Sequence, residues 1–181
     1  MQDLYGAREF LYFLPIGGTA TAPLAGLLSQ MGYRVEGVDL RLYPPMSTVL
    51  AELRIPVRLG YDPTLIPRDV DRVIIGSAVP RSNPEVEAVV AGGIPHLSQA
   101  EAVAHYVLGR GLRSIVVAGT HGKTTTTAMV AWILEQTGID PSSLIGGLPL
   151  WNPRGFRLGI GRWLVVEGDE YNSAFFDRGP K

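Results

Sequence analysis

Apolar and polar residues follow one another along the first hundred positions in blocks of two kinds. Short apolar runs at 10–14 and 73–77 predict buried strands, and a mixed run at 33–38 predicts a strand between them. Segment 22–31 is predicted as a helix that ends at Gly32, with one apolar face formed by Leu24, Leu27, Leu28 and Met31. This alternation of strand and helix predicts a parallel sheet with helices on both faces.

The later part of the chain repeats the strand-to-helix pattern. The apolar, partly β-branched run 114–118 predicts a buried parallel strand. The helix predicted next, over 125–136, has helically spaced residues at Met129, Trp132, Ile133 and Gln136. A further apolar strand is predicted at 162–166. A helical pattern at 100–108 precedes this part, and the glycines at 109–111 mark a boundary.

The segment between the strand at 114–118 and the helix after it reads Gly119-Thr120-His121-Gly122-Lys123-Thr124. A strand, a glycine turn and a helix start direct backbone N–H groups and the positive helix end towards phosphate oxygens. In such a loop Lys123 reaches the β- and γ-phosphates, and the Thr124 hydroxyl binds Mg²⁺. Val117 stands where a full P-loop has its first glycine, so this loop is a shortened variant. The alternative is a tight turn with a chance lysine.

An acidic motif follows the last predicted strand. Glu167 comes directly after that strand, and Asp169 and Glu170 follow it. A carboxylate at the carboxyl end of a strand beside the phosphate loop is where a nucleotide site finds its second Mg²⁺ ligand. Glu167 is the best candidate, while Asp169 or Glu170 could hold a second ion or a water. The alternative is a solvated acidic turn.

These patterns predict an α/β protein built from two units. Residues 1–110 are expected to form a complete Rossmann-like parallel-sheet domain. Residues 111–181 are expected to form the first part of a P-loop ATPase α/β domain. Because this second unit shows too few elements to cover a parallel sheet, it should leave apolar surface exposed. We therefore expect the second domain to be truncated.

The turn after the first strand offers a second phosphate site. Gly17, Gly18 and Thr19 follow that strand, and Asp39 lies about 20 residues further on, where dinucleotide-binding folds place a ribose-binding carboxylate. Pro15 stands where the first glycine of G-x-G-x-x-G belongs, and a proline has no N–H to offer a phosphate. The pattern leaves a ligand-binding role and ordinary strand–helix packing both open.

Composition and charge narrow the function. The 181 residues are 46% hydrophobic and carry a net charge of −1 without a basic cluster, so nothing points to nucleic acid. The absence of cysteine excludes disulfides, thiolate metal sites and a cysteine nucleophile. The amino terminus lacks a signal-peptide pattern, and no apolar run approaches a membrane span. A cytoplasmic protein without membrane contacts is the expectation.

The loop at 119–124 resembles the ATP loop of the Mur ligases, the amide-forming enzymes of peptidoglycan precursor synthesis. Stretches 43–48, 75–85 and 167–177 resemble the subgroup that joins UDP-N-acetylmuramate to the murein tripeptide L-alanyl-γ-D-glutamyl-meso-diaminopimelate. The subgroup that uses L-alanine shares the loop but carries serine where Tyr171 stands. Small departures from the pattern occur at Pro15, Gly17, Gly168 and Asn172.

The resemblance implies a set of roles. ATP and Mg²⁺ are the implied cofactors, and the implied mechanism passes through an acyl phosphate of the muramate carboxylate. Lys123 and Glu167 would be catalytic, and Thr124 and Glu167 would hold the metal. ATP would contact Gly119, Thr120, His121, Gly122, Lys123, Thr124 and Thr125. The UDP-sugar would contact Gly18, Thr19, Asp39, Ser77, Arg81 and Asn83, of which Asp39, Ser77 and the turn at 17–19 are expected to line one crevice.

The resemblance also implies that this chain lacks the rest of the ATPase domain and the amine-binding domain, so that it is inactive alone. Three other functions stay open at this point. One is ligation of UDP-N-acetylmuramate to L-alanine. The others are a small P-loop kinase or NTPase and a non-catalytic nucleotide-sugar binder.

Overall fold

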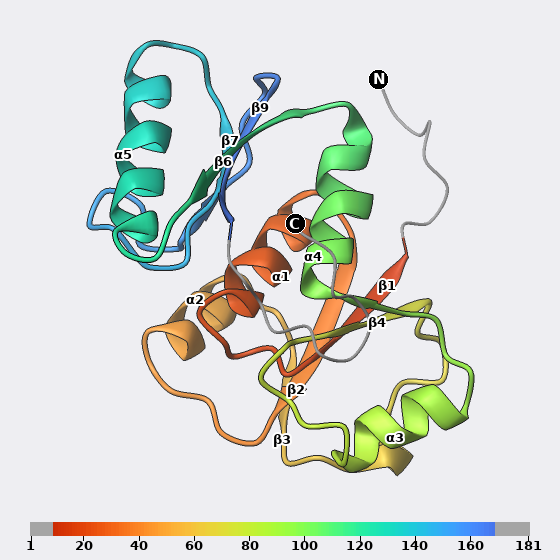
Figure 1. The fold of residues 1–181 in the computed structure, drawn as a ribbon. Coiled ribbons are helices and arrows are strands. Elements are labelled where there is room, and N and C mark those ends of the chain that lie inside the picture. The colour runs from red at the N-terminus through yellow and green to blue at the C-terminus, as the bar shows by residue number, and fades with distance from the viewer. Residues whose placement is uncertain (1–8, 169–181) are drawn as a thin grey trace.

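The computed structural model describes residues 9–168, which form two sheets (Figure 1). The first sheet has five parallel strands in the order β3-β2-β1-β4-β5. Its strands are β1 Phe10–Leu14, β2 Arg34–Asp39, β3 Val57–Leu59, β4 Arg72–Ile75 and β5 His96–Ser98. Its helices are α1 Thr21–Gln30, α2 Met46–Glu52, α3 Pro84–Ala91 and α4 Gln99–Ala102, and short helical turns lie at Pro63–Leu65, Val103–Val107 and Leu108–Arg110. The predicted Rossmann-like parallel sheet is confirmed.

Both faces of the first sheet are covered. Leu11 and Phe13 of β1 pack with α1, α2 and the helix that starts at α4, whereas Tyr12 and Leu14 pack with α3 on the opposite face. Because successive strand residues point to opposite faces, the central strand β1 is buried along its whole length. This explains why its sequence is a continuous apolar run.

The second sheet has the order β6-β9-β7-β8. Its strands are β6 Arg113–Ala118, β7 Ser142–Leu144, β8 Phe156–Arg157 and β9 Trp163–Gly168, and its helix is α5 Lys123–Gln136. Strands β6, β9 and β7 are parallel, and β8 is antiparallel to β7. Leu164 packs with α1, while Val165 packs with Ala131 of α5 on the other face. The sheet therefore lies between α5 and the first unit (Figure 1).

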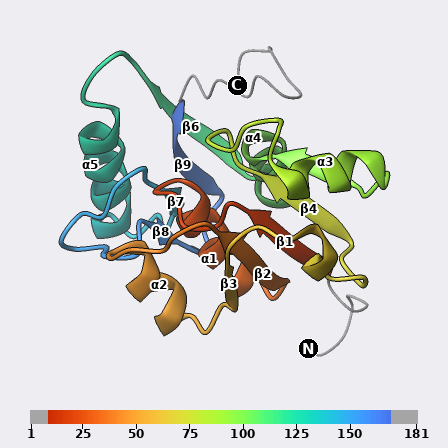
Figure 2. The ribbon, with the colours of Figure 1, turned by 90° about the horizontal axis from the view of Figure 1, so that it is seen from below.

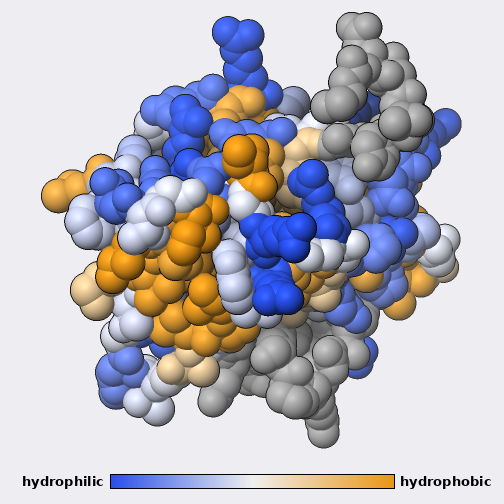
Figure 3. Space-filling model, turned by 90° about the horizontal axis from the view of Figure 1, so that it is seen from above, coloured by the Kyte–Doolittle hydropathy of each residue, from blue (hydrophilic) through white to orange (hydrophobic). Residues whose placement is uncertain are grey.

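The expectation that 114–118 is a buried strand is wrong. Strand β6 forms at this place but is largely exposed, because it is the edge strand of the second sheet. Helix α5 also forms, yet its spaced residues Met129, Trp132 and Ile133 are 46–53% exposed. The helix buries the smaller Thr127 and Ala131 against the sheet instead. Figure 3 shows apolar surface gathered on the side of the molecule seen from above.

Helix α1 belongs to both units. Its first eight residues are buried, because one side packs on the first sheet and the other meets the second. Figure 2 shows β8 beside α1, and a side chain at Gly26 would collide with the ring of Phe156 and with Leu53. An ion pair of 3.7 Å between Arg154 and Glu52 lies near this contact. The two sheets thus share one apolar core, and the division into domains at residue 110 stays a prediction.

The turn between the two sheets lies at Gly111, which has a φ of 80° and ends the helical segment before β6. Among the described residues, no helix has the length and apolar character needed to cross a membrane.

Candidate nucleotide and metal site

The loop between β6 and α5 has a backbone suited to anion binding. Gly119 and Gly122 have φ angles of 150° and 75°, which side-chain-bearing residues rarely adopt. Gly122 is the N-cap of α5, where no side chain caps the helix, and the first turn holds no acidic residue. The first N–H groups and the positive helix end therefore face outwards from the loop as a site for negative charge.

The ammonium group of Lys123 lies over this loop. Its Nζ donates a hydrogen bond of 2.9 Å to the backbone oxygen of Gly119. Thr120, His121 and Thr125 are exposed around it. The positive charge is thus held at the loop, and its contact with phosphate stays a prediction.

The structure brings together the two predicted metal ligands. Glu167 lies within β9 near its carboxyl end rather than directly after the strand as predicted, because its pairing opposite Val117 extends the ladder to Gly168. Since β9 is parallel to β6, Glu167 still reaches the same sheet edge as the phosphate loop. The Thr124 hydroxyl donates a hydrogen bond of 3.1 Å to Oε2 of Glu167. Two oxygens from separate elements therefore meet beside Lys123.

These two oxygens suit Mg²⁺. Adjacent ligands of an octahedral ion with bonds of 2.0–2.1 Å lie about 2.9 Å apart, close to the observed separation of 3.1 Å. Within residues 9–168 no three His, Asp or Glu side chains cluster as a metal cage. The pair of oxygens from Thr124 and Glu167 fits Mg²⁺, which binds through one or two protein oxygens with substrate phosphates and waters. Asp169 and Glu170 lie outside the described residues.

Gly146 is a contact that the sequence analysis missed. It follows β7, which neighbours β9, and its N–H donates a hydrogen bond of 2.7 Å to Oε1 of Glu167. The signal in the sequence was the pair Gly146-Gly147 directly after the apolar Leu144-Ile145. That signal carries no meaning until the pairing of β7 with β9 is known.

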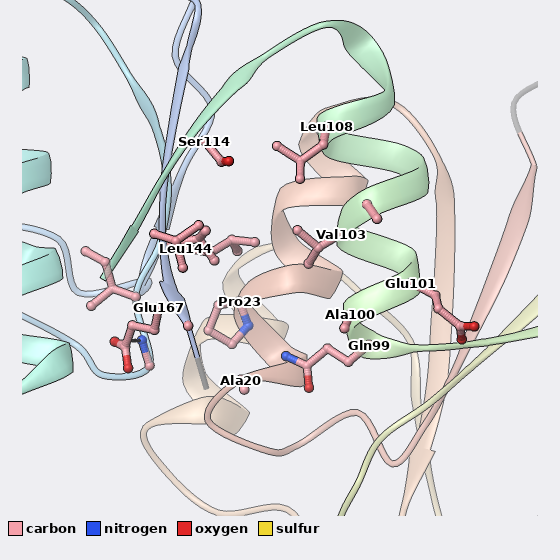
Figure 4. A pocket seen from close by; sticks show the side chains of 16 residues that line it. Ala20, Pro23, Gln99, Ala100, Glu101, Val103, Leu108, Ser114, Leu144 and Glu167 are labelled. Atoms are coloured by element: carbon pink, nitrogen blue, oxygen red, sulfur yellow. Dashed lines mark hydrogen bonds between the residues drawn. The ribbon is translucent and has the colours of Figure 1, made fainter. Parts of the chain in front are cut away.

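A cavity of about 370 Å³ opens beside Glu167 between the two units (Figure 4). Pro23, Gln99 and Leu108 line it from the first unit, and Ser114, Leu144 and Glu167 line it from the second sheet. Most of its wall is apolar, while Gln99, Glu101, Ser114 and Glu167 supply polar atoms. Mostly apolar cavities with a few placed polar groups are typical of small-molecule sites.

The first unit holds part of its predicted site together. Asp39 is the last residue of β2 rather than the residue after it, and its Oδ2 accepts a hydrogen bond of 2.8 Å from the N–H of Gly17. Gly18 and Thr19 are exposed beyond this contact. The Asp39 carboxylate therefore fixes the glycine turn, and whether it also contacts a ribose stays a prediction.

The other predicted sugar contacts follow β4. Strands β2, β1 and β4 are neighbours, so Ser77 lies at the same carboxyl edge as Asp39 and the turn, as the predicted crevice requires. Ser77 and Arg81 are exposed. Asn83 is buried as the N-cap of α3, where its Oδ1 accepts hydrogen bonds from the N–H groups of Glu85 and Val86. Its main observed role is to start the helix.

A buried polar network behind this edge was not anticipated. The Tyr12 hydroxyl lies between Glu85 and Arg58, and Arg58 pairs with Glu85 at 2.5 Å. Glu85 is fully buried and also accepts a hydrogen bond from the N–H of Asp62. Burial, together with the charge of Glu85, raises the pKa of the Tyr12 phenol.

A glycine loop at a helix start, a carboxylate on the neighbouring strand and a parallel α/β sheet form the arrangement typical of nucleotide-binding α/β proteins. The family model described as "Mur ligase family, catalytic domain" matches residues 11–110. This match covers more than half of the chain, and the chain belongs to the Mur ligase family. The resemblance seen in the sequence motifs is thereby confirmed, although the matched residues end before the loop at 119–124.

Individual relatives agree with this assignment. The chain is 44% identical over 171 residues to the UDP-N-acetylmuramate–L-alanyl-γ-D-glutamyl-meso-2,6-diaminoheptandioate ligase of Escherichia coli (strain K12), covering 94% of this chain and 37% of that protein. It is 42% identical over 170 residues to the UDP-N-acetylmuramate–L-alanine ligase of Rhodospirillum rubrum, with coverages of 91% and 34%. It thus spans little more than a third of these relatives.

A solved structure confirms the fold. The UDP-N-acetylmuramate:L-alanyl-γ-D-glutamyl-meso-diaminopimelate ligase from Neisseria meningitides superposes with a TM-score of 0.89 at 37% identity. The match covers 96% of this chain and 56% of that one. The arrangement of both sheets is therefore that of a Mur ligase.

Proposed function

We propose that this chain carries the UDP-sugar site and the phosphate loop of an ATP-dependent ligase. That ligase joins UDP-N-acetylmuramate to L-alanyl-γ-D-glutamyl-meso-diaminopimelate in the recycling of peptidoglycan. The observation that carries the proposal is the 3.1 Å contact between Thr124 of the loop and Glu167 of the neighbouring strand. The names of the relatives from E. coli and N. meningitides support the choice of substrates. Because the site uses ATP, we propose the cytoplasm as its location.

The cavity supports a reaction between two substrates held by different units. It runs from α1 and α4 of the first unit to Glu167 of the second sheet. A sugar bound at the carboxyl edge of the first sheet could thus extend a carboxylate towards the phosphate loop. Such placement converts a reaction between two bound molecules into an effectively unimolecular one.

The proposed reaction has two steps. An oxygen of the muramate carboxylate attacks the γ-phosphorus of ATP, which forms an acyl phosphate and releases ADP. The amino group of the tripeptide then attacks the acyl carbon, the C–O bond to phosphate breaks, and the amide and inorganic phosphate leave. A carboxylate is a poor electrophile until its oxygen becomes part of a phosphate leaving group.

The chain's own residues would position and neutralise charge in the first step. Lys123 and the N–H groups at the start of α5 would bind the β- and γ-phosphates. Thr124 and Glu167 would hold Mg²⁺, which supplies neutralisation of the phosphate charge when bound. Phosphoryl transfer needs mainly this positioning and electrostatic stabilisation, so no side-chain nucleophile is required.

Ligation to L-alanine is the second candidate, favoured by the 42% identity to the R. rubrum enzyme. We prefer the tripeptide because the motif at 167–177, with Tyr171, resembles the tripeptide subgroup. Residues 169–177 of that motif lie outside the described residues. A direct comparison would measure amide formation with each amine in a full-length ligase that carries this sequence.

Calorimetry on the 181-residue chain tests the proposal and separates it from its rivals. We expect UDP-N-acetylmuramate to bind and Mg-ATP to bind at most weakly, because within residues 9–168 the predicted contacts for ATP are confined to the loop and Glu167. Binding of ATP without the sugar would favour a kinase or NTPase, and binding of the sugar alone would favour a nucleotide-sugar binder. We expect no amide formation by this chain alone, since catalysis requires the ATP, the metal and the carboxylate to be fixed on several sides.

A further inference from the structure

Glu167 is held from two sides, and each of its oxygens has a different partner. Oε2 lies 3.1 Å from the Thr124 hydroxyl, whereas Oε1 accepts a 2.7 Å hydrogen bond from the N–H of Gly146. Hydrogen bonds from a backbone N–H to a carboxylate are short and strong. One oxygen of Glu167 is thus bound to the backbone, and the other is directed at the metal-binding hydroxyl.

Lack of space, and not a special backbone conformation, requires glycine at positions 146 and 147. Gly146 and Gly147 are not among the glycines with positive φ, so other residues could adopt their conformations. A β-carbon at Gly146 would lie 3.0 and 3.1 Å from the two Glu167 oxygens, and one at Gly147 would lie 2.9 Å from the Thr124 methyl group. These glycines allow the carboxylate and the hydroxyl to meet.

The number of oxygens that Glu167 offers bears on which ion it binds. Ca²⁺ accepts six to eight oxygens and often takes both oxygens of one carboxylate, whereas Mg²⁺ needs a compact octahedron with single oxygens. The N–H of Gly146 already occupies Oε1, which leaves Oε2 as the oxygen beside Thr124. We propose that Gly146 is a positioning residue that makes Glu167 a one-oxygen ligand and so selects Mg²⁺ over Ca²⁺. This inference rests on the proposed nucleotide site.

The test compares ATP binding with each metal in the 181-residue chain. Apparent dissociation constants for ATP are measured by calorimetry at saturating Mg²⁺ and at saturating Ca²⁺, in wild type, Gly146→Ala and Gly109→Ala. Changing a group that orients a metal ligand costs about 10- to 100-fold in metal affinity. We expect Gly146→Ala to weaken Mg-ATP binding by about that factor while Ca-ATP binding changes by less than about twofold.

Gly109→Ala is the matched control. A β-carbon there would meet only the backbone oxygen of Ala104, at 3.6 Å, an ordinary contact. Its ratio of Mg-ATP to Ca-ATP affinity should equal that of wild type. Binding of UDP-N-acetylmuramate should be unchanged in both variants, which shows that each remains folded.

The outcomes separate the inference from the proposed function. Equal weakening of Mg-ATP and Ca-ATP in Gly146→Ala, or no change in either, overturns the role of Gly146 in selectivity but leaves the nucleotide site standing. Absence of any metal-dependent ATP binding in wild type overturns the nucleotide site and the inference together.

If Gly146→Ala fails to bind the sugar and is therefore misfolded, Glu167→Asp is used instead. The shorter side chain withdraws the carboxylate from the Gly146 N–H while keeping its charge, and we expect the same loss of preference for Mg-ATP. An unchanged preference in Glu167→Asp overturns the inference.

Discussion

The hydroxyl of Tyr12 donates a hydrogen bond of 3.2 Å to the buried carboxylate of Glu85, 73 positions further along the chain. Arg58 of β3 donates to both groups, so strand β1, strand β3 and the start of α3 meet at one charge pair whose carboxylate is buried. Removing one partner of such a pair leaves an uncompensated charge and is more damaging than replacing the whole pair. The network fixes the start of α3 and the predicted sugar-binding residues before it.

This network predicts a pH dependence of stability in the alkaline range. Burial and the charge of Glu85 raise the pKa of Tyr12 above its ordinary value of 10.0. Above about pH 10 the unfolded chain loses this proton while the folded chain keeps it, so the free energy of unfolding falls as pH rises. Urea unfolding between pH 8 and 11 should show this decline, with a smaller slope in Tyr12→Phe.

The control for the alkaline experiment is Tyr43→Phe, because the Tyr43 side chain is 63% exposed. Its stability should follow pH as wild type does. An identical slope for wild type and Tyr12→Phe would contradict the prediction. Tyr106, whose pKa is also raised by burial and by its hydrogen bond to Glu9, should contribute to the slope that remains.

Gly26→Ala should destabilise the protein through the contact between the two units. The new methyl group would press on the ring of Phe156 and on Leu53. Overpacking of this kind costs about 1–3 kcal/mol, partly offset by the roughly 1 kcal/mol that alanine gains over glycine in a helix. Because the new β-carbon would lie less than 3.0 Å from the ring of Phe156, the cost should fall near the upper end of that range. We expect a net loss of about 2 kcal/mol in the free energy of unfolding, measured by urea denaturation.

Gln30→Ala, at the exposed end of the same helix, is the control for Gly26→Ala and should change stability by less than about 0.5 kcal/mol. A Gly26→Ala variant as stable as wild type would mean that β8 does not lie against α1 in solution.

Lys123→Ala should abolish most turnover in a full-length ligase that carries these residues. The ammonium group lies over the phosphate loop, bonded to the oxygen of Gly119. Loss of a charge that stabilises the transition state should lower the rate by about 10²-fold or more. UDP-N-acetylmuramate affinity should stay unchanged, because the proposed sugar site lies on the first unit. Lys123→Arg, which keeps the charge, separates loss of charge from loss of the side chain.

A Lys123→Ala enzyme that retains more than about a tenth of the wild-type rate would refute this role, since its transition state would have lost less than roughly 1.4 kcal/mol of stabilisation.

Amide hydrogen exchange should distinguish the two sheets. Strand β1 is central and buried on both faces, whereas β6 is an exposed edge strand and α5 presents three large apolar residues to water. Segments with little buried apolar area open at lower free energy. We expect amides of β6 and α5 to exchange about tenfold faster than those of β1, a difference of ~1.4 kcal/mol. Equal protection of both would contradict the prediction.

Local sequence patterns predicted strands β1, β2 and β4 of the first sheet and helix α1, but not the short strands β3 and β5. Strands β1 and β4 are apolar runs, and β2 is a mixed run between turn residues. Strands β7 and β8 were not predicted, because a three-residue strand that begins with two serines and a two-residue strand show no periodicity. The exposure of β6 was also missed, since burial of a strand depends on its neighbours in the sheet.

The contacts of the candidate site also fall into those that the sequence predicts and those that only the structure shows. Thr124 could be predicted because its loop follows a recognisable strand, and Glu167 because it lies at the carboxyl end of another, since parallel strands end at one edge. The contact of Gly146 with Glu167 and that of Glu85 with Arg58 depend on pairings between distant segments. No local pattern encodes which segments become neighbours, so these two contacts required the structure.

The position of α1 between the two sheets has a consequence for folding during synthesis. Its outer side meets Phe156, which is made 130 residues after Gly26. At 5–20 residues per second the ribosome needs about 7 to 26 s to add that stretch. During this time α1 can pack on the first sheet, but its other apolar side has no partner. The nascent chain therefore exposes an apolar side of α1 for several seconds. Slower translation between Gly26 and Phe156 would lengthen the time in which this side can aggregate with other chains.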